Sequence, residues 1–366
     1  MFKDRTLFII GAGASAEVGM PVGKKLSETI RENSLFKFEG SDQPTRGSYD
    51  LLRCLKQKHQ THEEINFRLS AFRQLHDGIY LSSSIDNYID MHFDNPHIAE
   101  VGKLSIVDAI SSAEQKSNLF VDLRESDPKI DLSQAGVSDS WLDSFARILL
   151  EKSQKDLGKI SENVSIICFN YDRCIEYYLT DAISQTLSIE YSTAREVVEN
   201  MNIIHPYGTL GQLPKSRGHI HGDQTVGFGF DLSEGLNPWP VVEKIKTYTE
   251  QIEDLETLER MRASVEEADQ IVFLGFAFHP QNMELLTLHH PTPPKRVYAT
   301  GMGVSRQETD EVTRRIVDLY RGESSSSISS FEYDQTDDLY ERYVVIENDV
   351  ECRDLFKLHW RNLLSA

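Results

Sequence analysis

The chain has 366 residues, more than most single domains, and can bury a large core. Its 58 acidic and 38 basic side chains give a formal net charge of −20, which disfavours nucleic-acid partners because such a surface repels a phosphate backbone. Four cysteines without a C-x-x-C pair indicate neither a zinc ribbon nor a disulfide framework, so we expect a cytoplasmic protein without a metal site.

The chain opens on a short apolar strand followed by a glycine-rich turn. Residues 6–10 predict a buried strand, and residues 11–21 read GAGASAEVGMP. This turn fits the pattern G-x-G-x-x-G/A, in which glycines let backbone amides approach a pyrophosphate at the amino end of a helix. Gly19 and Pro21 stop the helix early, so we expect a loop that closes over a bound dinucleotide. A tight strand-to-helix turn without a ligand is the alternative.

The next helix does not continue the pattern of a hydride-transferring enzyme. In that pattern an acidic residue about 20 positions after the glycines binds the ribose at the end of a second strand. Glu32 has this spacing, yet it lies in the helical segment 23–33 with no strand before it. The sequence therefore favours a different use of the dinucleotide.

Helical patterns then run from residue 49 to residue 154. The segments 102–120 and 140–155 each place apolar side chains on one face, as a packed helix does. The whole region is too long for an ordinary crossover between two parallel strands. We therefore predict an inserted helical domain over 36–159.

Strands return after residue 160 and alternate with helices. Further strands are predicted over 164–169, 202–204, 270–274 and 296–299, the last one at an edge of the sheet. Helices are predicted over 172–184, 241–267, 281–289 and 306–320. The alternation predicts an α/β fold with a doubly wound, mainly parallel, Rossmann-like sheet and a large helical insertion. Residues 1–35 and 160–322 would form its core.

The C-terminal part of the chain, 323–366, is acidic and starts near a serine run at 324–327 that is typical of a flexible loop. It contains one predicted strand over 343–346 and a last helix that ends near Leu364. We expect this segment to contact an oligomer partner or a second protein.

Three polar clusters each follow a predicted strand. The clusters FNYD, HPYG and GFAF come directly after the strands that end near residues 169, 204 and 274. Ligands bind outside the carboxyl ends of strands in open parallel sheets, so these clusters and the first turn should meet in one crevice. Each polar side chain also has a structural explanation: Asp172 as a helix cap, Asn170 as a turn residue and His205 as a buried histidine.

The segments GAGAS-AE-x-GMP, FNYD, HPYG and LGFAFHPQN together resemble the sirtuin-like (silent-information-regulator-like) superfamily. They cover the strand-forming parts of the chain, within 5–33 and 160–300. The segments SIDNYID and GKLSIVDAI are similar to bacterial defence members. The resemblance implies a protein that binds NAD+ as a substrate and cleaves its bond between nicotinamide and ribose. Several bacterial branches deplete NAD+ when a phage is sensed, often within large assemblies.

The sequence departs from the superfamily in three places. Protein-deacylating sirtuins carry Asp-Phe-Arg after Gly-x-Pro, where this chain has VGK, and they carry a four-cysteine zinc module, which this sequence lacks. Both departures argue against acyl-lysine chemistry and for simple hydrolysis. The superfamily's catalytic histidine directly precedes the glycine, where this chain has Tyr207. We favour His205 as the base, with His221 in GHIHGD as the alternative.

Cleavage of the nicotinamide bond passes through an oxocarbenium-like ribose cation. Asn170 is suited to bind the ribose hydroxyls or the attacking water, Asp172 to bind the carboxamide or anchor the loop, and His205 to take a proton near neutral pH. Asp86 is expected to cap a helix or to touch the ribose. The expected contacts to NAD+ come from Gly11, Ala12, Gly13, Ser15, Glu17, Pro21, Asp86, Tyr207, Gly208, Gly275 and Phe276.

The sequence as a whole predicts an NAD+ glycohydrolase that releases nicotinamide and ADP-ribose and depletes NAD+ in antiphage defence. A non-catalytic sensor or scaffold that binds NAD+ or ADP-ribose is the alternative. Because such an activity must be held in check, the resemblance implies a homo-oligomer or a complex with a second defence protein, for example a HerA-like ATPase. No membrane partner is expected, since no apolar segment reaches the roughly 20 residues of a membrane span.

Overall fold

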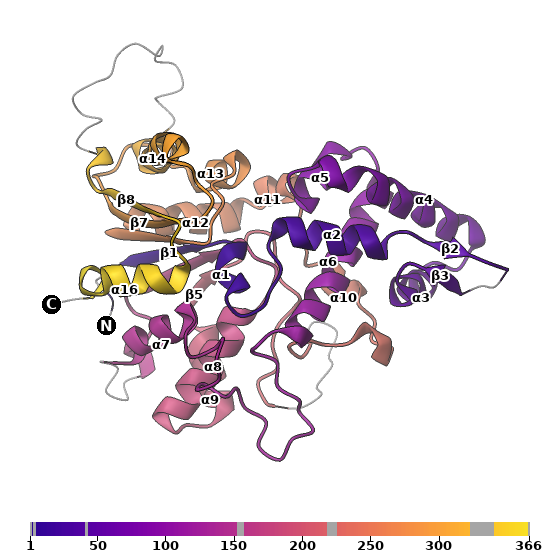
Figure 1. Ribbon diagram of the computed structural model, residues 1–366, viewed down its shortest axis with the longest axis horizontal. Helices are drawn as coiled ribbons and strands as arrows, with labels where there is room; N and C mark the ends of the chain where they lie inside the picture. Colours follow the sequence, from indigo (N-terminus) through magenta and orange to yellow (C-terminus); the bar gives the residue numbers. More distant parts are fainter. Residues whose placement is uncertain are drawn as a thin grey trace, which may run out of the picture.

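The computed structural model describes residues 2, 5–40, 43–151, 157–217, 225–322 and 340–364. Its centre is a six-stranded parallel sheet with helices on both faces (Figure 1). The strands, in their order across the sheet, are β5 (Asn202–Ile204), β4 (Val164–Cys168), β1 (Thr6–Ile10), β6 (Gln270–Leu274), β7 (Arg296–Gly301) and β8 (Val344–Asn348). The predicted α/β, doubly wound, Rossmann-like fold is confirmed.

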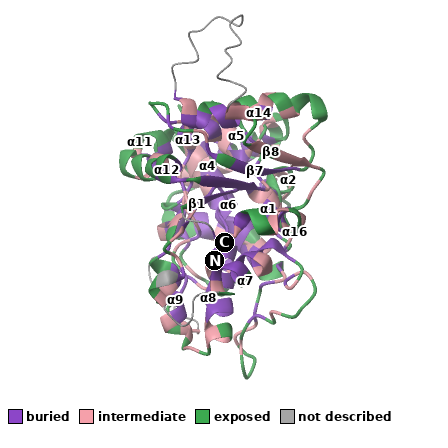
Figure 2. Cartoon of the chain, turned by 90° about the vertical axis from the view of Figure 1, so that its left-hand side faces the viewer, coloured by how far each residue is buried: buried purple, intermediate pink, exposed green. Residues whose placement is uncertain are grey.

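The strand order reverses at the centre of the sheet. From β1 the chain winds outward through β4 to β5, and it then returns to pair β6 with the other side of β1. Every residue of β1 and β6 is buried, and Figure 2 shows the central strands enclosed by the helix layers, because apolar runs such as LFII need cover on both faces. The crevice outside the carboxyl ends of β1 and β6 is the usual place for a ligand.

Helices account for most of the remaining described chain. They are α1 (Ala12–Ala16), α2 (Gly23–Asn33), α3 (Tyr49–Lys58), α4 (His62–Gly78), α5 (Ile85–Met91), α6 (Pro96–Lys116), α7 (Trp141–Glu151), α8 (Cys174–Leu187), α9 (Tyr191–Glu199), α10 (Trp239–Val242), α11 (Tyr248–Glu253), α12 (Leu255–Glu267), α13 (Pro280–Leu286), α14 (Arg306–Arg321) and α16 (Cys352–Leu363). The 3₁₀ turns η1 (Ile79–Leu81), η2 (Leu157–Lys159) and η3 (Leu232–Glu234) and the small hairpin β2 (Lys37–Phe38) and β3 (Pro44–Arg46) complete the described elements. No helix in these ranges is long and apolar enough to cross a membrane.

The helices α2 to α6 form a module beyond the carboxyl ends of the strands (Figure 1). Four of them begin at a polar side chain that accepts a backbone N–H, which satisfies one of the unpaired amides at a helix start. These caps are Ser48, Thr61, Ser84 and Asn95. The sequence pattern therefore specified the helices locally, and their apolar faces join them in one module.

Packing assigns two helices differently from the predicted boundaries 1–35 and 36–159. The helix α2 packs on α4 and α6 and so belongs with the helical module. The helix α7 covers the sheet, because Phe145 packs against Phe2 and Phe8 and the Trp141 indole donates to the Ala14 carbonyl. An apolar stripe on a helix does not reveal which surface the helix will cover. The sequence therefore did not show that α2 belongs to the helical module and α7 to the sheet.

Two further expectations differ from the structure at the far side of the sheet. The strand predicted as an edge, β7, pairs with β6 on one side and β8 on the other. The edge is β8, which comes from the acidic C-terminal segment expected to be a contact surface. The helix α16 that follows buries Leu355 and Phe356 against the same face as α7. The serine run 324–327 lies outside the described residues.

The single helix predicted over 241–267 is three shorter ones, α10, α11 and α12. Thr247 and Asp254 each accept an N–H at a new helix start. The break lets α10 pack on α6 and α11 pack on α5, so this segment connects the helical module to the sheet. The residues after β5 thereby form part of the wall around the carboxyl ends of the strands.

Candidate functional site

The turn after β1 and the turn after β6 are in direct backbone contact. The N–H of Gly11 donates to the Leu274 carbonyl at 2.9 Å, and that of Gly13 donates to the Gly275 carbonyl at 3.0 Å. A Cβ on Gly11 would lie 2.5 Å from the Gly275 oxygen, and one on Gly275 would lie 2.0 Å from the nitrogen of Ala14. These glycines are therefore required by the contact between the two turns.

This use of the glycines differs from the phosphate contact predicted for them. Two of the amides expected to face a pyrophosphate, those of Gly11 and Gly13, already bind protein carbonyls. A glycine pattern indicates only that another group approaches the backbone closely. Here the approaching group is the neighbouring turn. Phe276, directly after the second turn, is buried at the same edge of the sheet.

The side chains of Asn170, Ser15 and Asp172 form a hydrogen-bonded chain at the end of β4. The amide Nδ2 of Asn170 donates to the Gly11 carbonyl at 3.1 Å and to the Ser15 hydroxyl at 2.9 Å, and that hydroxyl donates to Asp172 at 3.2 Å. Asp172 also accepts the N–H of Cys174 at the start of α8, so its predicted capping role is present. Burial raises the pKa of the Asp172 carboxyl, and the hydrogen bonds oppose this.

Nothing within the described residues donates to Oδ1 of Asn170. The two bonds made by Nδ2 hold the amide in one orientation against the first turn. Oδ1 is thus the atom of this group that can accept from a ligand hydroxyl or a water. The sequence expectation that Asn170 meets the glycine turn is met in the geometry.

His205 lies at the end of β5 and has both ring nitrogens engaged. Nδ1 is 3.1 Å from the Asn170 carbonyl, and Nε2 is 2.8 Å from a carboxylate oxygen of Glu176. Burial lowers the pKa of His205, but the Glu176 carboxylate outweighs it and holds the pKa well above 6.5. The imidazole is therefore a buried cation in an ion pair, and it contacts the backbone of Asn170 rather than its amide.

Aromatic rings line the same edge of the sheet between the two halves of the fold. Phe169 packs on Phe276 and Tyr207, with ring centroids 5.2 and 5.9 Å apart, and Tyr171 lies 6.3 Å from Tyr207. The Tyr207 hydroxyl donates to Asn282 at 2.6 Å. These side chains are a hydrophobic wall next to Asn170, of the kind that small-molecule sites use.

Asp86 reaches this wall from the helical module. It lies in the first turn of α5 and accepts a hydrogen bond from the Tyr171 hydroxyl. Burial raises the pKa of Asp86 to about 6, since the hydrogen bond from Tyr171 offsets only part of the desolvation. Ser84, rather than Asp86, caps this helix. Asp86 is thus a carboxylate placed beside the crevice without a cationic partner among the described residues.

Glu17 is placed elsewhere. One carboxylate oxygen accepts the Trp141 N–H at the start of α7, and the other accepts the Arg353 N–H in the first turn of α16. Burial raises the pKa of this carboxyl, which the two amides partly counter. A carboxylate at two helix starts is a structural link between α1 and two helices of the sheet layer. The structure does not bring it to the cluster around Asn170.

The remaining predicted residues lie nearby or outside the described part of the chain. Ala12 begins α1, and Pro21 is half-buried in the loop before α2. Gly208 has a φ of +74° and lies in a tight turn. A Cβ at this position would clash with the Lys244 carbonyl. His221, the alternative base, lies outside the described residues.

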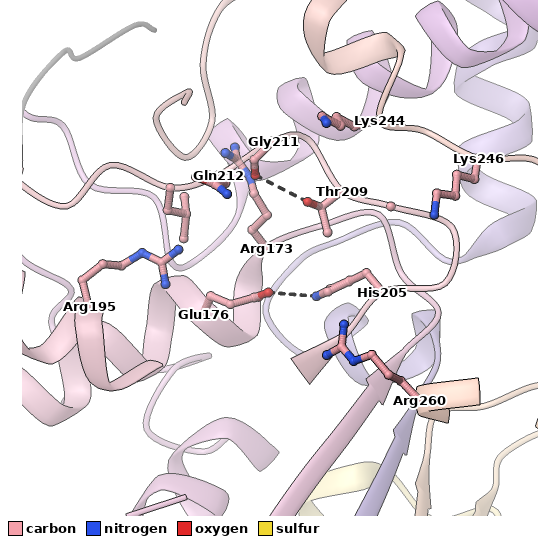
Figure 3. Close-up of a pocket in the computed structure, with 12 residues that line it drawn as sticks. Arg173, Glu176, Arg195, His205, Thr209, Gly211, Gln212, Lys244, Lys246 and Arg260 are labelled. Atoms are coloured by element: carbon pink, nitrogen blue, oxygen red, sulfur yellow. Dashed lines mark hydrogen bonds and ion pairs between the residues drawn. The ribbon is translucent and has the colours of Figure 1, made fainter. Parts of the chain in front are cut away.

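A cavity of about 580 Å³ opens beside His205 on the side of β5 (Figure 3). It lies between α8, α9 and the segments after β5, and Glu176 and His205 form part of its wall. Glu176 lies in the first turn of α8 and was not predicted as a site residue. The Arg173–Glu114 ion pair at 2.6 Å, which joins α8 to α6 in the interior, was not predicted either.

No protein-family model and no curated protein sequence matches the chain. Among the described residues, no group of three or more His, Cys, Asp or Glu side chains is arranged to hold a metal ion. A Rossmann-like fold by itself hosts many activities, so the function is argued from the site.

Proposed function

We propose that the protein is a sirtuin-like NAD+ glycohydrolase that cleaves the nicotinamide–ribose bond to give nicotinamide and ADP-ribose. The observation that carries this proposal is the position of Asn170. Its side chain is held against the glycine turn of β1, at the reversal point of the sheet, with Oδ1 left to accept a hydrogen bond. A dinucleotide lying across this edge would place a ribose beside that atom.

The chemistry needs little acid catalysis, because nicotinamide leaves as a neutral group. The enzyme must shelter an oxocarbenium-like cation and position a water. In this proposal Oδ1 of Asn170 orients the water or a ribose hydroxyl, and the Asp86 carboxylate stabilises the developing positive charge. The wall formed by Phe169, Tyr171 and Tyr207 excludes bulk water and accommodates the nicotinamide ring.

The role of His205 in this scheme is positional. As an imidazolium with both nitrogens bound, it holds the backbone carbonyl of Asn170 and so supports the orientation of that residue. A proton-accepting role would first require the pair with Glu176 to open. This same observation favours the second candidate function, a sensor that binds NAD+ or ADP-ribose without turnover.

The biological setting is proposed from the resemblance: depletion of NAD+ in antiphage defence, within a homo-oligomer or beside a partner such as a HerA-like ATPase. One structural feature supports an assembly. Large apolar side chains are exposed in the segment that leads into and out of α5, which is unusual for a monomer surface. They are Tyr80, Leu81, Met91 and Phe93.

The direct test is release of nicotinamide from NAD+, followed by chromatography, by the purified wild-type chain and by variants. Asn170→Ala and the isosteric Asp86→Asn should each lower the rate by about a hundredfold or more, since a positioned catalytic group typically contributes about 10²–10⁴-fold. Asn362→Ala, at an exposed position of α16, is the matched control and should keep the rate. Thermal melting establishes that each variant is folded.

Two results would overturn the proposal in different ways. Unchanged release by folded Asn170→Ala and Asp86→Asn would place the reaction elsewhere. Binding of NAD+ by the wild type without any nicotinamide release, also in the presence of the assembled partner, would establish the sensor.

A further inference from the structure

We propose that the cavity beside β5 is a second binding site, for a small molecule that carries both a phosphate and free hydroxyl groups, such as a sugar phosphate or a nucleotide. The residues that line this cavity include neither Asn170 nor Asp86, on which the proposed NAD+ chemistry rests. Its volume of about 580 Å³ lies within the range of about 300–1,000 Å³ typical of ligand pockets. The inference does not depend on the NAD+ chemistry proposed above.

The charge of the lining is the first argument. In a chain with a net charge of −20, the described lining contains a single acidic side chain, Glu176. The basic side chains of the lining are Arg173, Arg195, His205, Lys244, Lys246 and Arg260. They come from α8, α9, α12 and the segments after β5, and Figure 3 shows them around one space. Such a concentration of positive charge in an acidic protein favours an anionic ligand.

Protein carboxylates neutralise only part of this charge. Arg173 is paired with Glu114, and Lys246 is paired with Asp254. Among the described residues, the amine of Lys244 forms no ion pair or hydrogen bond. To the residues that the structure describes, Arg260 donates one side-chain hydrogen bond, to the Asn202 amide oxygen at 3.5 Å. Two cations are therefore available to bind the oxygens of a phosphate.

Unpaired buried atoms are the second, independent argument. Arg195 is 6% exposed, and its Nε has no hydrogen-bond partner in the described structure. Its contact with Glu199 is long, at 3.7 Å, and is made by a different nitrogen. Within the described part of the chain, Oε2 of Glu176 is also buried without a partner. A buried polar group without a partner is unfavourable, so a ligand that pairs with it binds more tightly.

The two unpaired atoms require opposite partners. Nε of Arg195 is a donor and needs an acceptor, which a phosphate oxygen provides. Oε2 of Glu176 is an acceptor and needs a donor, which a hydroxyl group provides. An inorganic anion without a hydroxyl group, such as sulfate, would satisfy the first atom and be repelled by the second. A phosphate attached to a sugar satisfies both, and this is why the ligand is assigned to that class.

The test is isothermal titration calorimetry of the full chain with ribose 5-phosphate, ribose and sulfate as separate probes. Ribose 5-phosphate should bind, and each of the other two should bind at least about tenfold more weakly, since each lacks one of the two required partners. Lys244→Ala, at an exposed position, should weaken ribose 5-phosphate binding by about fivefold to tenfold. Arg195→Met tests the buried donor and should weaken it further.

Matched controls separate this site from the NAD+ crevice. Lys24→Ala makes the same charge change at an exposed position of α2, and Asp86→Asn alters the crevice; both should leave ribose 5-phosphate binding unchanged. Absence of binding to the wild type, or equal binding by wild type and Lys244→Ala, would overturn the proposal. Sulfate binding as tightly as ribose 5-phosphate would overturn the assignment of the ligand class. If the protein released no nicotinamide, neither the existence of this binding site nor the class of its ligand would be affected.

Discussion

Substitution of Gly275 by alanine should strongly destabilise the protein, because two separate costs fall on one residue. Gly275 has a φ of +57°, and an L-residue held in this left-handed region costs about 1–2 kcal/mol. Its Cβ would also lie 2.0 Å from the nitrogen of Ala14 and 2.4 Å from the carbonyl carbon of Gly13. Both are backbone atoms that cannot rotate away, so the two turns must separate.

The total loss follows from adding these costs. Overpacking in a well-packed region costs about 1–3 kcal/mol, which with the backbone strain predicts a loss of about 2–5 kcal/mol. The matched control is Gly23→Ala at the start of α2, where no atom lies within 4 Å of the added Cβ and φ is not positive. Removal of a flexible glycine from a helix should leave the free energy of unfolding of the protein unchanged or raise it by up to about 1 kcal/mol.

Urea unfolding followed by tryptophan fluorescence measures both variants. The buried Trp141 contributes to this signal and donates to the carbonyl of Ala14 beside the altered turn. We expect a lower midpoint for Gly275→Ala and an unchanged or higher midpoint for Gly23→Ala. A Gly275→Ala midpoint equal to that of the wild type would refute the argument that the glycines exist for the contact between the turns.

Three further predictions concern charged side chains. Glu176→Gln should lower the free energy of unfolding by about 1.5–3 kcal/mol near pH 6. Because the pKa of His205 is raised in the folded protein, the ion pair stabilises the fold fully below about pH 6.5, and this contribution is lost as the pH rises through the folded pKa. The difference in stability between the variant and the wild type should therefore narrow at alkaline pH, which urea midpoints measured across pH would show. Release of nicotinamide should fall as pH drops through about 6, where Asp86 becomes protonated, and a flat profile in that range would exclude its carboxylate as the stabilising charge. Glu114→Ala, which leaves a buried cation without its partner, should cost about 3–5 kcal/mol, whereas the exposed Asp269→Ala should cost less than about 1 kcal/mol; equal melting of the two variants would contradict this.

The sequence by itself determined the elements and the class of fold. The apolar runs 7–10 and 271–274 have no polar position to expose, so they had to be strands covered on both faces. The start of the helix predicted from residue 306 was readable because a polar residue, Ser305, precedes it. The position of Asn170 beside the glycine turn followed from parallel topology, because carboxyl ends of such strands lie at one edge.

Only the tertiary structure decided what each polar or glycine residue contacts. Gly11 and Gly275 had to be glycine in either reading, but their partner, another turn rather than a phosphate, depends on how β1 and β6 pair. His205 and Glu176 are 29 positions apart, and their ion pair exists because β5 and α8 pack together. Periodicity and propensity act over a few residues, whereas these contacts depend on the pairing of distant segments, which local sequence does not encode.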